Sequence, residues 1–218
     1  MKLTDIFQRL GTGPLQQARI GDNAIEGQLN ASNYQAILPL LNAGMVALHT
    51  RFLLKRKEAE IVLVGGQTTY TLTDSELLQV EAVTDQLGRP LALNDPNDLC
   101  SLRTRSLNVL YVPPAVVDVL KVTSLTVSYR VLAAPIPGGI ATDEELALVE
   151  VDLPLPYLEP LVYYVAWQLF NPRSPSENFH EGSHYAQLYE AACTQLEGEG
   201  LELDDGLPND RLWRNGWV

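Results

Sequence analysis

The sequence is poor in cysteine and in basic residues. Its 218 residues include two cysteines, Cys100 and Cys193, which lie far apart and form no C-x-x-C pair. We therefore expect two free thiols in a reducing compartment rather than a disulfide framework. The 15 basic side chains are outnumbered by 27 acidic ones, which gives a formal net charge of −12. Tight, charge-driven binding to nucleic acid needs clustered Lys and Arg, and this balance argues against it.

Long apolar runs are also missing. The longest fall far short of the roughly 20 residues that a membrane-spanning helix needs. The first 14 residues contain no uninterrupted apolar stretch, so we expect no secretory signal. Hydrophobic residues nevertheless make up 46% of the chain, enough to bury a core. We expect a soluble protein made in the cytosol, with one large domain or a core that carries an inserted subdomain.

Few motifs carry chemistry. The sequence has no nucleophile elbow and no P-loop, and the Asn/Asp cluster at 94–98 lacks the distal Glu of a calcium loop. One match has to be weighed, because His180, Glu181 and His184 fit the pattern H-E-x-x-H. On a helix the two histidines of this pattern share a face and bind zinc, and the glutamate acts as general base.

The context of this motif argues against a zinc site. Gly182 stands at its centre, and the motif lies at the start of a predicted helix rather than within one. A third ligand would have to come from Glu197, Glu199 or Glu202, in or beside a tail that cannot hold an open site rigidly. We therefore predict no catalytic, metal or cofactor-binding residues, and a zinc-dependent hydrolase is the alternative function.

Apolar spacings of three and four residues predict helices at both ends of the chain. A short helix covers residues 3–10, with Thr4 or Asp5 available as its cap. A long one covers residues 32–58; Ser32 caps it, Pro39 kinks it or marks a later start, and basic residues complement the dipole at its end. Two further helices, at 157–170 and 179–197, are joined closely enough to be antiparallel neighbours. Residues 15–30 are expected to form an irregular arm.

Between these helices the apolar period changes to two, which is typical of strands. Short strands are predicted at residues 61–64, 68–73, 79–84, 90–93, 99–103, 107–112, 125–132 and 146–151. The sequence therefore predicts an α+β fold, in which an antiparallel helical bundle carries an inserted antiparallel β-sandwich or barrel and ends in an extended arm. The expected divisions are 1–58 and 154–198 for the helical core, 59–153 for the β-subdomain and 199–218 for the arm.

The C-terminal arm combines acidic residues with tryptophans. It lacks the apolar periodicity needed to fold alone. Tryptophan is favoured as an interface anchor, so we interpret the arm as a docking segment, the alternative being a disordered chain end. Its predicted contact residues are Leu201, Leu203, Leu212, Trp213 and Trp217.

The order of these segments resembles that of the head-to-tail adaptor proteins of short-tailed bacteriophages, a family that includes tail tubular and head-completion proteins. The resemblance lies in pattern and order over most of residues 32–196, chiefly in segments 40–57, 67–72, 78–93, 125–134 and 152–170.

The resemblance implies a homo-oligomeric ring, commonly a dodecamer, under the portal protein in the neck of a virion assembled in the host cytoplasm. Its helices would surround the DNA channel and its β-subdomain would face tail nozzle, tube, fibre or sheath proteins. Arms of this kind clasp the portal, a role that suits Trp213 and Trp217. DNA would pass without specific binding, because an acidic wall repels it. A stopper or tail-completion protein with the same plan stays open as an alternative.

Overall fold

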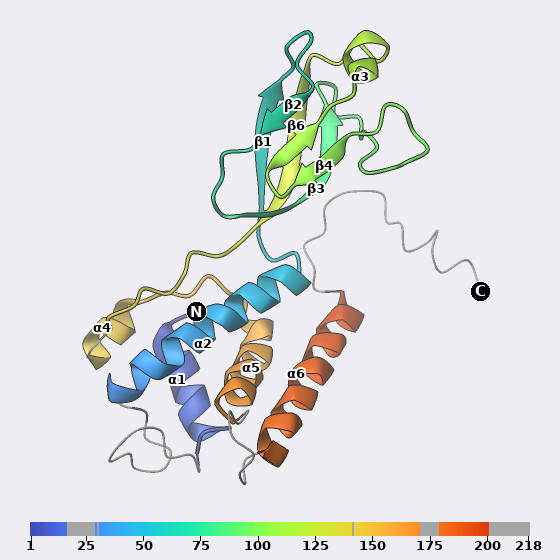
Figure 1. Ribbon diagram of the computed structural model, residues 1–218. Coiled ribbons are helices and arrows are strands. Elements are labelled where there is room, and N and C mark those ends of the chain that lie inside the picture. Colours follow the sequence, from blue (N-terminus) through green and yellow to red (C-terminus); the bar gives the residue numbers. More distant parts are fainter. Residues whose placement is uncertain (17–28, 30, 141, 171–178, 201–218) are drawn as a thin grey trace, which may run out of the picture.

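The computed structural model describes residues 1–16, 29, 31–140, 142–170 and 179–200. Over these ranges the chain has a mixed α+β fold with six α-helices and two small antiparallel sheets. Figure 1 shows the helical part and the β part as separate layers joined by two extended stretches of chain. No closed barrel is present in the described ranges, so the barrel alternative of the predicted fold is wrong.

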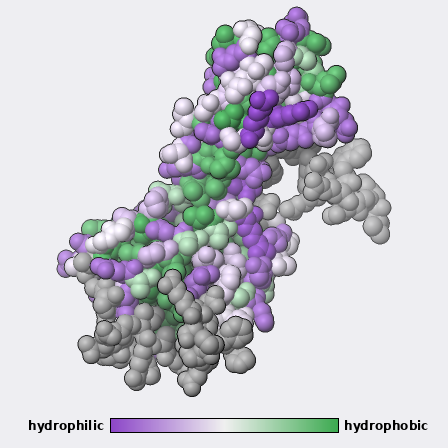
Figure 2. Space-filling model, viewed as in Figure 1, coloured by the Kyte–Doolittle hydropathy of each residue, from purple (hydrophilic) through white to green (hydrophobic). Residues whose placement is uncertain are grey.

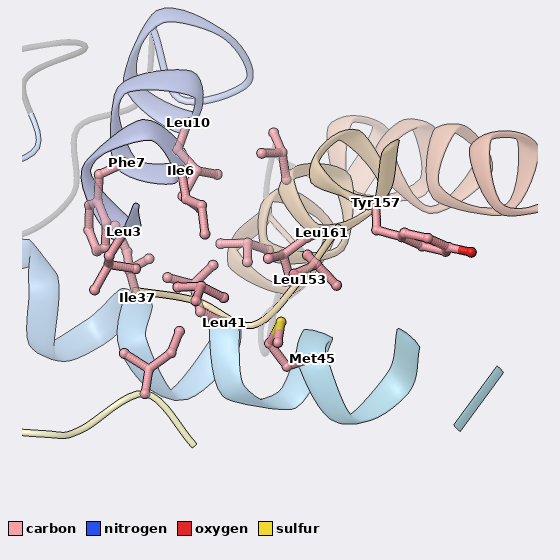
Figure 3. Close-up of a cluster of buried hydrophobic side chains, with 14 of the residues drawn as sticks. Leu3, Ile6, Phe7, Leu10, Ile37, Leu41, Met45, Leu153, Tyr157 and Leu161 are labelled. Atoms are coloured by element: carbon pink, nitrogen blue, oxygen red, sulfur yellow. The ribbon is translucent and has the colours of Figure 1, made fainter. Parts of the chain in front are cut away.

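The helical part is built on one hydrophobic core. Its elements are α1 (Leu3–Thr12), α2 (Ala31–Arg51), α4 (Asp143–Leu148), the 3-10 turn η1 (Leu155–Tyr157), α5 (Leu158–Phe170) and α6 (Phe179–Glu199). In α1 the buried residues are spaced as the sequence predicts: Leu3, Ile6, Phe7 and Leu10. Figure 3 shows these side chains pointing toward α2 and α5. The chain folds back on its start, since the Leu3 N–H donates to the Val149 carbonyl at 3.0 Å.

The β part contains two three-stranded sheets around a second core. One sheet has the order β1–β6–β3, from β1 (Arg56–Val62), β6 (Ser124–Val131) and β3 (Leu77–Asp85). The other has the order β2–β5–β4, from β2 (Thr69–Thr71), β5 (Val109–Tyr111) and β4 (Arg103–Ser106). Both sheets and the short helix α3 (Pro114–Asp118) contribute to one cluster that includes Leu110, Val116 and Val127.

The long predicted helix ends earlier than expected. It was predicted to reach residue 58, but α2 ends at Arg51 and β1 begins at Arg56. The basic residues at 55–57 therefore do not complement the helix dipole. Lys57 instead pairs with Tyr129 in the sheet register, and its ammonium lies 3.0 Å from Asp74 and 2.9 Å from Glu76. The conformation of residues 55–57 therefore depends on pairing with β6, which lies far along the chain.

The starts of two helices also differ from prediction. The residue that precedes α1 is Lys2, and the Asp5 carboxylate accepts its backbone N–H at 3.3 Å from within the first turn. Because α2 begins at Ala31, Ser32 lies inside the helix rather than capping it. Pro39 is also an interior residue, so it does not mark a later helix start.

Three predicted strands are wrong. The segment at 90–93 forms only isolated bridges, at Pro90 and at Leu93. At 99–103, Leu99 is 87% exposed in a turn, and the strand begins only at Arg103. The segment at 146–151 begins in α4, a helix with a capping box in which the Glu145 N–H donates to the Thr142 hydroxyl at 3.2 Å. Acidic residues in the first turn favour this helix, and the T-x-x-E pattern was readable in the sequence.

Candidate functional site

The H-E-x-x-H motif lies on α6, and the described residues group no third ligand with it. His184 is exposed, and its ring contacts that of Tyr185 with centroids 5.6 Å apart. Glu197 lies thirteen residues further along the same helix, which corresponds to about 20 Å at the α-helical rise. Over the ranges that the structure describes, no three His, Cys, Asp or Glu side chains are grouped so as to hold a metal ion. The side chains of His180 and Glu181 lie outside what is described.

The predicted docking arm follows directly from the end of α6. Gly200 adopts a φ of 64°, and its N–H donates to the Glu197 carbonyl at 3.3 Å. A glycine in this left-handed conformation is the common way to end a helix. The five predicted contact residues, Leu201, Leu203, Leu212, Trp213 and Trp217, lie outside the described residues.

The end of α6 is attached to α2 by ion pairs. Arg51, in the last turn of α2, lies 2.7 Å from Glu190 and 2.7 Å from Glu197, two turns apart on α6. The hydrogen bonds that Arg51 donates to Glu197 and Glu190 raise the pKa of its guanidinium. Cys193 lies between them in sequence and is fully buried, and this burial raises the pKa of its thiol. The thiol is therefore protected, and the point from which the arm departs is fixed.

Aromatic side chains fill the contact between α5 and α6. Tyr164 packs edge-on against Tyr189 at 5.5 Å, and Trp167 stacks on Tyr189 at 6.2 Å. Phe170 stacks on Tyr185 at 5.6 Å near the other end of the pair. Figure 1 shows the two helices side by side and antiparallel, as the sequence predicts. Aromatic contacts of this geometry add to the area burial and hold the two helices as one unit.

The junction between the two parts contains the third histidine. His49 is 1% exposed, and its Nδ1 lies 3.3 Å from the carbonyl oxygen of Val131 at the end of β6. Burial lowers its pKa, against the opposing effects of the Val131 carbonyl and of Asp152. Beside it, Arg130 donates to the Thr50 carbonyl at 2.6 Å. This role was not predictable from the sequence, because a single histidine in a helix has no motif.

The charge of the chain is unevenly distributed. Residues 1–132 carry twelve basic and twelve acidic side chains, whereas residues 133–218 carry three basic and fifteen acidic ones. The whole net charge therefore belongs to the last part of the chain, which includes α4, α5, α6 and the arm. Such a distribution repels polyanions from those elements and attracts basic surfaces.

The β part has a basic and aromatic face that the sequence analysis missed. Arg103 and Tyr111 are paired in the register of β4 and β5, and the Arg105 guanidinium lies 4.3 Å from the centre of the Tyr111 ring. Both arginines are exposed. The alternation R-T-R in β4 was the available signal, because side chains two residues apart in a strand share a face.

A family model described as SU10 adaptor protein matches residues 15–205. No curated protein matches the chain. Across the described ranges, no helix combines the length and the apolar character that crossing a membrane requires.

Proposed function

Because the chain belongs to the SU10 adaptor protein family, we propose that it forms a ring between the portal and the tail of a phage and lines the DNA channel there. The family consists of structural phage proteins that act as head–tail adaptors in the virion neck, and it is not an enzyme family. The match over residues 15–205 is the observation that carries this proposal. The acidic character of residues 133–218 supports it, because a negative wall does not retain DNA.

In this proposal the arm clasps the portal. The arm follows the end of α6, and Arg51 links this end to α2 through two ion pairs. The start of the arm is then held in place while its later residues bind the portal. An arm that orders on binding loses conformational entropy, and its affinity per contact is modest. A ring, commonly of twelve copies, compensates through the high effective concentration of its remaining arms.

We further propose two folding units within each copy, an antiparallel helical bundle and an inserted two-sheet sandwich. The expected first boundary lies near residue 58, between the two cores. We place the second nearer residue 132 than 153, because Ile136, Ile140 and Leu153 belong to the helical core. The β unit would face tail nozzle, tube, fibre or sheath proteins. A stopper or other tail-completion protein would share this plan and differ in its neighbours.

The zinc hydrolase hypothesis gains no support. The distance along α6 keeps Glu197 away from His184, and the family is structural. Measuring bound zinc on the purified chain tests this alternative directly. Stoichiometric zinc together with hydrolytic activity lost in Glu181→Gln would establish it.

Mass photometry of the purified chain, alone and mixed with the portal from the same genome, tests the adaptor proposal. We expect the chain to add to the portal in a fixed multiple. The variant Trp213→Ala with Trp217→Ala should keep the fold and bind the portal at least tenfold more weakly, since a buried interface tryptophan contributes about 2 kcal/mol or more. Asn209→Ala with Asn215→Ala is the matched control in the same segment. Equal binding by all three chains would refute the arm's role.

A further inference from the structure

The sheet β2–β5–β4 has one face that points away from the core of the β part. Tyr70 and Leu110 lie on the inner face and are buried. Their neighbours along the strands therefore lie on the outer face, because side chains alternate. In β2 the flanking threonines, Thr69 and Thr71, are both exposed. The register pairs Tyr111 with Thr69 on one side and with Arg103 on the other.

This outer face is basic and carries no carboxylate on its strands. Its charged members are Arg103 and Arg105, and neither forms an ion pair with any residue that the structure describes. Three other basic residues of the β part are neutralised: Lys57 by Asp74 and Glu76, Arg89 by Asp85, and Arg130 by Glu81. Figure 2 shows strongly hydrophilic side chains gathered where Figure 1 labels β3 and β4.

The face is also preorganised. The Arg105 guanidinium is held over the Tyr111 ring at 4.3 Å, a cation–π geometry that limits its freedom before any partner arrives. Arginine and tyrosine are enriched at protein interfaces, where both supply large contact area. A partner for this face must bring negative charge, and the chain itself has an excess of it in residues 133–218.

We propose that this face, defined by Arg103, Arg105 and Tyr111, docks the acidic C-terminal segment of a second copy of the chain. Residues 197–205 read EGEGLELDD and hold five carboxylates, more than any other stretch of nine residues in the sequence. Two of these are used within the copy, because Glu197 pairs with Arg51 and Glu199 accepts from Gln195. Glu202, Asp204 and Asp205 follow them.

The spacing of charges agrees with this occupant. Arg103 and Arg105 are two residues apart in β4; its register against β5 shifts between Thr104 and Ser106, but the Arg105 guanidinium still lies over Tyr111, the register partner of Arg103. When the partner segment binds in an extended conformation, Glu202 and Asp204 also share one side, again two residues apart. Facing pairs of opposite charge then stabilise the contact. The inference rests on the proposed ring, in which a head-to-tail interface gives each copy one neighbour's face and offers its own segment to another.

The test is a charge exchange in the full-length chain. One variant carries Arg103→Glu with Arg105→Glu, and the other carries Glu202→Lys with Asp204→Lys. We expect the wild-type chain to self-associate, and each variant alone to do so at least tenfold more weakly, as close charge pairs across an interface allow. Mixing the two variants should restore association, because each then meets a complementary partner. Sedimentation velocity at about 50 mM and about 500 mM salt measures this and its screening.

A matched control separates the face from net charge. Lys2 and Lys121 are exposed, so Lys2→Glu with Lys121→Glu changes the net charge equally and should leave self-association as in the wild type. The proposal is overturned if the wild-type chain stays monomeric at every concentration. It is also overturned if both charge variants self-associate as strongly as the wild type. If the wild-type chain binds duplex DNA, and R103E/R105E loses this binding but still self-associates, the face is a nucleic-acid-binding surface instead.

Measuring portal binding by the same variants distinguishes a failure of this inference from a failure of the proposed function. Adaptors that bind the portal in the same number of copies with and without R103E/R105E overturn the inference alone. A chain that shows no portal binding in any form, but self-associates through the charged face, refutes the adaptor proposal and leaves the docking face standing.

Discussion

The helical part and the β part bury their hydrophobic cores in different ways. The helical part closes over long sequence distances, since Val151 donates to the Met1 carbonyl at 2.8 Å and the Tyr34 hydroxyl donates to Asp143. The β part closes within residues 56–131, where β6 is the central strand of one sheet and β5 that of the other. A segment inserted in this way can vary its surface while the helical core stays intact. The two parts also differ in their surfaces: the acidic excess lies in the residues that follow the β part, and the basic face lies on the β part.

The largest expected effect separates the stability of the two parts. Leu161 is fully buried in the helical core, and Leu110 is fully buried in the β core. Leu161→Ala should lower the free energy of unfolding of the helical part by about 2–5 kcal/mol, because it removes buried methyl groups and leaves a cavity. Denaturant unfolding followed by tryptophan fluorescence measures it, since Trp167 belongs to the helical part.

Leu110→Ala is the matched variant for the other core. It should leave the tryptophan-detected transition in place and expose amides of β5 and β6 to hydrogen exchange. If both variants shift the tryptophan transition equally, the two parts unfold as one cooperative unit. In that case the two parts differ in their surfaces but not in their stability.

A smaller effect is expected at the contact between α2 and α5. A Cβ added to Gly44 would lie 2.6 Å from Leu161 Cδ1 and 3.0 Å from Tyr164 Cδ1. Leu161 is fully buried and has little room to move away. Gly44→Ala should therefore cost about 1–3 kcal/mol through overpacking. A gain in helix propensity of about 1 kcal/mol offsets part of this and leaves a net loss on the order of 1 kcal/mol.

Gly198 provides the opposite case on α6. A Cβ there would meet nothing within 4 Å, so Gly198→Ala should stabilise the chain by up to about 1 kcal/mol. Thermal unfolding of both variants checks the pair. If the Gly44→Ala variant is as stable as the Gly198→Ala variant, the contact between α2 and α5 is looser than its distances indicate.

The sequence predicted elements whose pattern is local. The helices at 3–10, 157–170 and 179–197 correspond to α1, α5 and α6, because amphipathic spacing alone specifies them. It failed at residues 52–58, where the strand forms only because β6, some seventy residues later, supplies its partner. No local signal could show that.

The candidate surfaces were less accessible to prediction than the fold. The role of Trp213 and Trp217 stays a prediction, since they lie outside the described residues. The R-T-R alternation signalled that Arg103 and Arg105 share a face, but their exposure and the absence of a counter-charge are properties of the folded chain. The role of His49 was not predicted, and only the position of β6 shows that this residue lies between the two parts.

The smallest effect concerns this junction and depends on pH. Burial lowers the pKa of His49 below its ordinary value of 6.5, although the Val131 carbonyl and Asp152 act in the opposite direction and Lys55 acts with burial. Above pH 6.5 the imidazole is neutral in both the folded and the unfolded chain. Below it the unfolded chain binds the proton more readily, so the free energy of unfolding should fall, by at most about 1.4 kcal/mol per pH unit.

His49→Gln should remove this dependence between about pH 7.5 and pH 5, because glutamine does not titrate and its amide can still reach the Val131 carbonyl. His184→Gln changes an exposed histidine of the helical part and should keep the wild-type dependence. Carboxylates whose pKa is lowered, such as Asp152 beside Lys55, lose their contribution only at more acidic pH, so they do not confuse the measurement. Denaturant unfolding across this pH range decides the point. If the slope persists in His49→Gln, the acid sensitivity belongs to one of the two parts and not to the contact between them.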